Sequence, residues 1–136
     1  RWEDPERALL SDYLIELDAI LATESANSDQ RAENFATPMF VSEEISASAA
    51  LVQSTKILID ALQRLSPPER ALELHQEAVE NLGRVLEWLT LELQAAETRD
   101  NVSVRAANAM IPEINARGFT LKRNLSNLKF IFNIPE

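Results

Sequence analysis

The side chain best suited to chemistry in this chain is its only histidine, His75. A histidine can act as a metal ligand, a general base or a phosphoacceptor. His75 falls between Leu72 and Val79 on an apolar stripe, and no second residue stands out as its catalytic partner. We therefore predict a partly buried imidazole that is hydrogen-bonded inside the fold, and we predict no catalytic residue.

The composition disfavours metal and cofactor sites. The chain has no cysteine, which excludes thiolate metal sites, iron–sulfur clusters and cysteine nucleophiles. Glu73, Glu77 and Glu80 share one helical face, but a carboxylate-bridged di-iron bundle also needs more than one histidine. Two glycines are too few for a phosphate loop or a dinucleotide fingerprint. We predict no metal and no cofactor.

Two known families share single features with the chain. Histidine phosphotransfer domains are four-helix bundles, but their motif places a basic residue and a glycine just after the histidine, where this chain has Gln76 and Glu77. The rhythm of residues 14–21 resembles the first helix of the helical chorismate mutases, which implies a small all-helical enzyme. That active site needs several converging Arg and Lys side chains. This chain has only three lysines, and no arginine is assigned to a core stripe, so the enzyme is kept as an alternative.

Length and charge narrow the class of protein. The 136 residues form one domain's worth of sequence, and the net charge of -9 argues against nucleic acid or an anionic membrane surface as a partner. We expect no apolar run of about 20 residues that could span a membrane. The first residue is Arg1 rather than an initiator Met, so we expect a fragment without its native N-terminus, with room for a membrane tether upstream.

The composition indicates an all-α fold. The chain has 19 Leu and 18 Ala, both strong helix formers, and only 2 Gly. Apolar stripes at spacings of three and four predict an antiparallel up-down-up-down four-helix bundle. We place the helices at about 5–24, 38–65, 67–98 and 100–131, the last kinked near Pro112 or broken near Gly118.

Local sequence signals set the expected helix ends. Asp4 before Pro5 is expected to cap the first helix, and residues 25–37 read as a polar loop. Ser66 and Glu69 are expected to form a capping box around the start of the third helix. Residues 99–136 carry 6 basic and 3 acidic groups, so a basic fourth helix is expected between two acidic ones.

The two ends of the predicted bundle differ in composition. One end is rich in Leu and Phe, and we expect the apolar tail 130–135 to pack there, with Trp2 nearby. The other end is rich in Ala and Ser, which either let helices pack closely or leave a pocket between them. If it is a pocket, its walls are predicted to include Ser48, Thr90, Gln94 and Asn108, with a lid formed by Phe35, Met39 and Phe40.

These observations favour a non-enzymatic binding or interaction domain. Its general shape resembles the extracytoplasmic helical domains of bacterial lipoproteins and membrane-bound sensors. That resemblance implies a place outside the cytoplasm or at the cell surface, with a protein or a small molecule as partner. Two alternatives stay open: a ligand-sensing domain of a membrane receptor, and a cytoplasmic protein.

Overall fold

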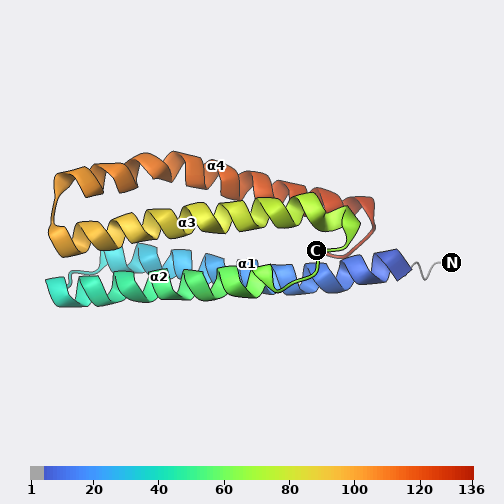
Figure 1. Ribbon diagram of the computed structural model, residues 1–136, viewed down its shortest axis with the longest axis horizontal. Helices are drawn as coiled ribbons and strands as arrows, with labels where there is room; N and C mark the ends of the chain where they lie inside the picture. Colours follow the sequence, from blue (N-terminus) through green and yellow to red (C-terminus); the bar gives the residue numbers. More distant parts are fainter. Residues whose placement is uncertain (1–4) are drawn as a thin grey trace.

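The computed structural model describes residues 5–136 and shows four long helices packed side by side (Figure 1). The elements are α1 (Pro5–Ala36), α2 (Val41–Gln63), the short 3₁₀ helix η1 (Glu69–Ala71), α3 (Leu72–Thr98) and α4 (Asn101–Ile131). Successive helices run in opposite directions (Figure 1). The predicted all-α, up-down-up-down four-helix bundle is therefore confirmed.

The expected loop at residues 25–37 is wrong, because α1 continues without interruption to Ala36. The segment is polar, but it contains neither glycine nor proline before Pro38, and Ala26, Arg31 and Ala32 are good helix formers. The helix ends only as Pro38 approaches, because a proline disfavours helical backbone at the residue before it. The polar residues show that α1 changes from apolar contacts in its first half to polar contacts in its second half.

The expected capping box at the start of the third helix is also wrong. Residues 66–68 are not helical, and Pro68 has an extended backbone with ψ of 160°. Pro67 precedes another proline, which pushes it out of the helical region, so it cannot serve as the first helical residue. The capping interaction at a helix start occurs instead before α2, where the Phe40 N–H donates to Glu43 Oε1 at 3.0 Å.

The α3–α4 connection is short and well defined. Arg99 adopts a left-handed conformation with φ of 57° and ends α3. Asp100 then caps α4 by accepting hydrogen bonds from the N–H of Ser103 at 2.9 Å and from its hydroxyl at 2.8 Å. These bonds lower the pKa of Asp100. The α4 helix is continuous through Pro112 and Gly118, and its ribbon curves in its first half (Figure 1).

Buried side chains form two clusters, one in each half of the bundle. The base cluster lies at the end where α1 begins and α4 ends. It consists of Leu10, Tyr13, Leu14, Leu17, Ile20, Leu58, Leu62, Ala71, Leu74, Ala78, Leu82, Leu121 and Leu125. The far cluster consists of Leu51, Val52, Val85, Trp88, Leu89, Ala107 and Ile114. Among the described residues, α1 supplies no member of the far cluster.

The predicted packing of the apolar tail is confirmed for part of it. Phe132 and Ile134 pack against the base cluster, whereas Phe130 and Ile131 are exposed. The Arg7 guanidinium donates to the carbonyls of Phe132 at 3.0 Å and Asn133 at 2.7 Å, so the tail is tied to α1. Trp2 and the expected cap Asp4 lie outside the described residues.

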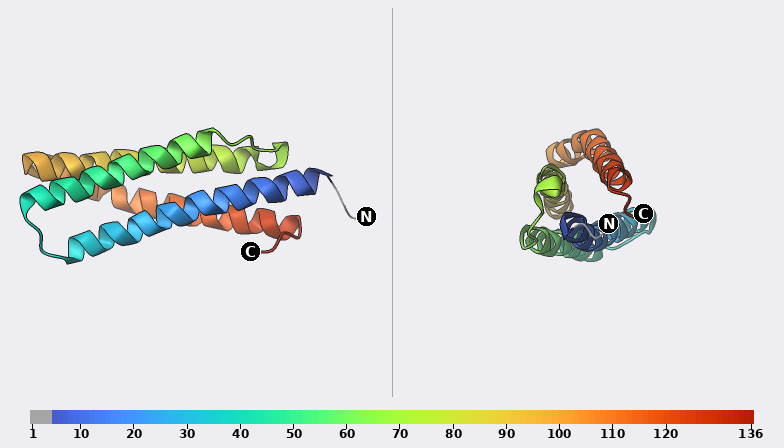
Figure 2. Two further views of the ribbon diagram at one scale, coloured as in Figure 1. Left: turned by 90° about the horizontal axis from the view of Figure 1, so that it is seen from below. Right: turned by 90° about the vertical axis from the view of Figure 1, so that its right-hand side faces the viewer.

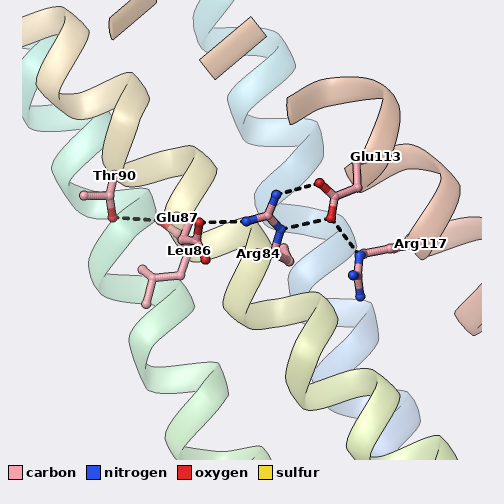
Figure 3. Close-up of polar contacts among 6 residues, drawn as sticks. All are labelled: Arg84, Leu86, Glu87, Thr90, Glu113 and Arg117. Carbon is pink, nitrogen blue, oxygen red and sulfur yellow. Dashed lines mark hydrogen bonds and ion pairs between the residues drawn. The ribbon is translucent and has the colours of Figure 1, made fainter. Parts of the chain in front are cut away.

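The basic helix α4 reaches both acidic helices. Lys129 of α4 is buried and donates to Asp18 of α1 at 2.7 Å. Toward α3, Glu113 accepts from Arg84 at 3.0 and 2.5 Å and from Arg117 of its own helix at 2.9 Å (Figure 3). These hydrogen bonds lower the pKa of Glu113. The end-on view shows the four helices surrounding a common interior (Figure 2).

We expected no segment that could span a membrane, but one of the described helices, α2, is long and apolar enough to do so. By length and composition alone, α2 passes such a test, with a mean hydropathy of 1.2 over its most apolar stretch. This is weak evidence, because core helices of soluble proteins pass the same test. In the bundle, α2 contributes Leu51, Val52, Thr55, Leu58 and Leu62 to the interior.

Candidate functional site

The most unusual arrangement in the molecule is an arginine held between two aromatic rings inside the far half. The Arg31 guanidinium of α1 lies 4.1 Å from the ring centre of Trp88 and 4.4 Å from that of Phe35. It also forms a two-pronged ion pair with Glu92 of α3, in which Nε donates to Oε1 at 2.8 Å and Nη2 donates to Oε2. The two charged side chains are only 19% and 11% exposed.

Helical periodicity explains how these four residues meet. Arg31 and Phe35 are four residues apart on α1, and Trp88 and Glu92 are four residues apart on α3, so each pair occupies one face of its helix. A guanidinium stacks on aromatic faces and matches a carboxylate with two parallel hydrogen bonds, which lysine cannot do. The arrangement therefore fixes the last turns of α1 onto α3 through one side chain.

Two adjoining hollows open around this cluster at the far end of the bundle. The first, about 200 Å³, is lined by Arg31, Asn34, Phe35, Thr37, Met39, Glu44, Ala47, Ser48, Leu51 and Glu92. The second, about 380 Å³, is lined by Phe35, Glu44, Glu92, Ala95, Ala96, Arg99, Asn101, Val104, Ala107 and Asn108. The hollows share Phe35, Glu44 and Glu92, and together we call them the end pocket.

The structure brings together some of the predicted pocket residues. Ser48 lines the first hollow, Asn108 lines the second, and Phe35 lines both. Met39 from the predicted lid also lines the first hollow. Phe35, Ser48 and Asn108 come from α1, α2 and α4, whereas Met39 lies in the α1–α2 connection.

Thr90, Gln94 and Phe40 line neither hollow and are exposed. Thr90 follows the buried Val85 by five residues, which places it about 140° around the helix from that inward direction. Its hydroxyl donates to the Leu86 carbonyl of its own helix at 2.7 Å (Figure 3). Phe40 precedes α2, and its side chain is 80% exposed.

Arg31, Glu92, Trp88 and Glu44 are the site residues that sequence reasoning missed. Arg31 falls in the segment predicted as a loop. In the structure it lies on α1 and points inward to Trp88 and Glu92, so the expectation that no arginine lies on a core stripe is wrong. A signal was present, since Arg31 follows the buried Leu17 by 14 residues, close to four helical turns. Extending the α1 stripe through the polar segment would have found it.

Along α1, half-buried polar side chains lie between Ile20 of the base cluster and Arg31 of the end pocket. Asn27 of α1 donates to Ser54 of α2 at 2.8 Å. Burial raises the pKa of the nearby Glu24 carboxyl, while Lys122 and Ser28 act in the opposite direction. Glu24 and Trp88 both line a small cavity of about 10 Å³, and the Trp88 Nε1 has no hydrogen-bond partner among the described residues.

His75 lies in the base half, away from the end pocket. The Tyr13 hydroxyl lies 2.9 Å from His75 Nδ1, and burial lowers the pKa of His75 and raises that of Tyr13 to about 12. The predicted role as a half-buried, hydrogen-bonded histidine is confirmed. The described residues contain no group of three or more His, Asp or Glu side chains that could hold a metal ion.

Comparisons with protein-family models, with curated proteins and with solved structures found no match. A function for this chain must therefore be inferred from the chemistry of the end pocket.

Proposed function

We propose that this chain is a non-enzymatic binding domain whose ligand, a small and partly apolar organic molecule, occupies the end pocket. The observation that carries this proposal is the pair of adjoining hollows of about 200 and 380 Å³ around an exposed aromatic ring, Phe35. Pockets between bundle helices, with apolar walls and a few polar groups, are common ligand sites.

The lining residues support binding rather than turnover. Met39, Ala47 and Leu51 offer apolar contact in the first hollow, and Ser48 offers a hydroxyl. Among the described residues, the two carboxylates that line this hollow, Glu44 and Glu92, are each paired with an arginine, and neither is hydrogen-bonded to the Ser48 hydroxyl as a general base would be. The two arginines of the pocket are each bound by a carboxylate, so they do not form the converging cationic site of a chorismate mutase.

Intrinsic fluorescence offers a direct test. The chain has two tryptophans, so Trp2→Phe leaves Trp88, beside the pocket, as the sole reporter. We would titrate this variant with 2-phenylethylamine, phenylacetamide and phenylacetate, which share one ring and differ in charge. We expect saturable changes in Trp88 emission with at least one probe.

A matched pair of substitutions localises the effect. Ala47→Phe fills the first hollow and is expected to abolish binding, whereas Ala49→Phe places the same ring on an exposed position that lines neither hollow. Circular dichroism should show that both variants keep the helical content and the melting temperature of the wild type, so that a loss of binding is not due to unfolding. Binding that survives Ala47→Phe, or no binding of any probe, would contradict the proposed function.

One feature favours a ligand-sensing domain as the second candidate. The end pocket lies opposite the end where α1 begins and α4 finishes, as expected for a sensing domain that binds its ligand at one end and passes the signal on at the other (Figure 1). As a sensing domain, the protein is proposed to lie outside the cytoplasm. Fractionating source cells and measuring the intact mass of the native gene product tests it: a processed or lipidated form supports export, and an unprocessed cytosolic form contradicts it.

A further inference from the structure

We infer that the end pocket selects an organic cation, an ammonium group carried on an apolar body. This inference rests on the proposed function and names the chemical class of its ligand. Each hollow is lined by two carboxylates, Glu44 and Glu92, and by one guanidinium, Arg31 in the first and Arg99 in the second. The two carboxylates are shared, so the end pocket as a whole holds two carboxylates and two guanidinium groups, and carboxylates outnumber guanidinium groups only within each hollow taken alone. The first hollow is the one in which the single guanidinium, Arg31, is covered by aromatic rings and by a two-pronged carboxylate.

The two carboxylates differ in how firmly they are held. Glu92 is 11% exposed and makes a two-pronged pair with Arg31, so removing that partner would leave a buried charge. Glu44 is 43% exposed and meets Arg99 through one contact of 3.1 Å, and Arg99 is itself 51% exposed. An ion pair this exposed contributes little to stability, so a ligand cation can replace Arg99 at Glu44 without stranding a buried group.

Phe35 supplies a second contact for a cation. Its ring covers the Arg31 guanidinium, yet Phe35 is 71% exposed and lines both hollows, so part of the ring stays open to a ligand. Aromatic rings attract organic cations, and the positive charge of Arg31 behind this ring is balanced by Glu92. The apolar body of the ligand then contacts Met39, Ala47 and Leu51.

An organic anion fits the same pocket poorly. In the first hollow it would approach two carboxylates, and to reach Arg31 it would have to displace Glu92 from a two-pronged pair. The more exposed Arg99 lines only the second hollow, away from the apolar wall formed by Met39, Ala47 and Leu51. The net charge of -9 works in the same direction, because it raises the local concentration of cations and lowers that of anions. The charge around the first hollow and the total charge of the chain therefore favour the same class of ligand.

The test compares the three probes by isothermal titration calorimetry on the complete chain. We expect 2-phenylethylamine to bind about 5-fold or more tightly than the neutral phenylacetamide, and phenylacetate to bind most weakly. Glu44→Gln should remove the advantage of the amine and leave the amide unchanged. Glu33→Gln is the matched control, because it removes one negative charge from an exposed position on α1 that lines neither hollow.

The outcomes separate this inference from the proposed function. If phenylacetamide or phenylacetate binds as tightly as the amine, and Ala47→Phe abolishes that binding, the cation inference is overturned and the pocket stands. If no probe binds, both are overturned. If Glu33→Gln weakens the amine as much as Glu44→Gln does, the preference reflects total charge, and the assignment to Glu44 is overturned. Raising the salt concentration should weaken amine binding alone, which tests the ion pair without any substitution.

Discussion

The base half and the far half of this bundle use the same helix for opposite purposes. In the base half, α1 turns Leu10, Leu14 and Leu17 inward, and each of them is at most 1% exposed. Three turns later, α1 turns Asn27 and Arg31 inward, and each meets a polar partner on α2 or α3. The base half gains its stability mainly from apolar burial, to which the Lys129–Asp18 pair and the Tyr13–His75 hydrogen bond are added. The far half instead pairs the polar side chains that α1 turns inward, and it leaves hollows beside them.

The largest expected effect tests the role of the base half in stability. Leu14→Ala should lower the free energy of unfolding by about 3 kcal/mol, because it leaves a cavity in a closed apolar cluster. Leu51→Ala, which removes the same atoms beside the first hollow, should cost about 2 kcal/mol, because part of its surroundings is already open. Urea unfolding of both variants measures the two losses of free energy. A loss from Leu51→Ala that equals or exceeds the loss from Leu14→Ala would contradict the expected difference between the two halves.

The next prediction tests whether the stability of the far half depends on the pairing of its buried charges. Arg31→Met should lower the free energy of unfolding by about 2 kcal/mol, because Glu92 is then buried without its partner. The double variant Arg31→Met with Glu92→Met should recover most of that loss, because no charge is left behind. Thermal and urea unfolding of the two variants provide the measurement. A double variant that is no more stable than the single one would show that stacking on Phe35 and Trp88, rather than charge, holds the cluster.

The smallest effect is a difference in pH dependence between the halves. Burial raises the pKa of Glu24, so its contribution to stability is present below about pH 4.5 and is lost as the pH rises through its folded pKa. Burial lowers the pKa of His75, so its contribution is present above about pH 6.5 and is lost as the pH falls through its folded pKa.

Two single variants separate these contributions. Glu24→Gln should exceed the wild type in stability at pH 7 and lose that advantage below pH 4.5, whereas His75→Gln should flatten the profile below pH 6.5. Unfolding curves measured between pH 4 and pH 8 give the result. If the free energy of unfolding of each variant changed with pH in the opposite direction to that expected, Glu24 and His75 would not be desolvated in the folded protein.

The fold could be predicted from the sequence wherever the inward face is apolar. The stripe Leu10, Leu14, Leu17 locates the first half of α1 because leucines at helical spacing are favoured only on a buried face. The tail residues Phe132 and Ile134 were placed at the base for the same reason. The error at residues 25–37 arose because a polar inward face has the same composition as a loop.

The site was only partly predictable for a related reason. Alanine and serine mark where helices leave space, which is why Ser48 was found. Phe35 was predicted as part of a loop lid, and it lines the pocket from the last turn of α1 instead. The partners of a buried charge cannot be read in the same way, because Arg31 and Glu92 lie 61 residues apart. Their meeting depends on the rotation of two helices about their axes, which no local pattern records.

The unequal share of α1 in the two core clusters has a consequence for hydrogen exchange. The backbone amides of residues 8–20 open only when the base cluster comes apart, so they should exchange at the rate of global unfolding. The amides of residues 27–36 are held to the rest of the bundle by few contacts, chiefly the Asn27–Ser54 hydrogen bond and the Arg31 cluster. We expect these last turns to detach and return while the base stays folded, and each such opening would widen the end pocket by moving Arg31 and Phe35 away from α3. The opening rate of these turns, measured at Arg31 under conditions where opening limits exchange, therefore sets an upper limit on how fast a molecule enters or leaves by that route.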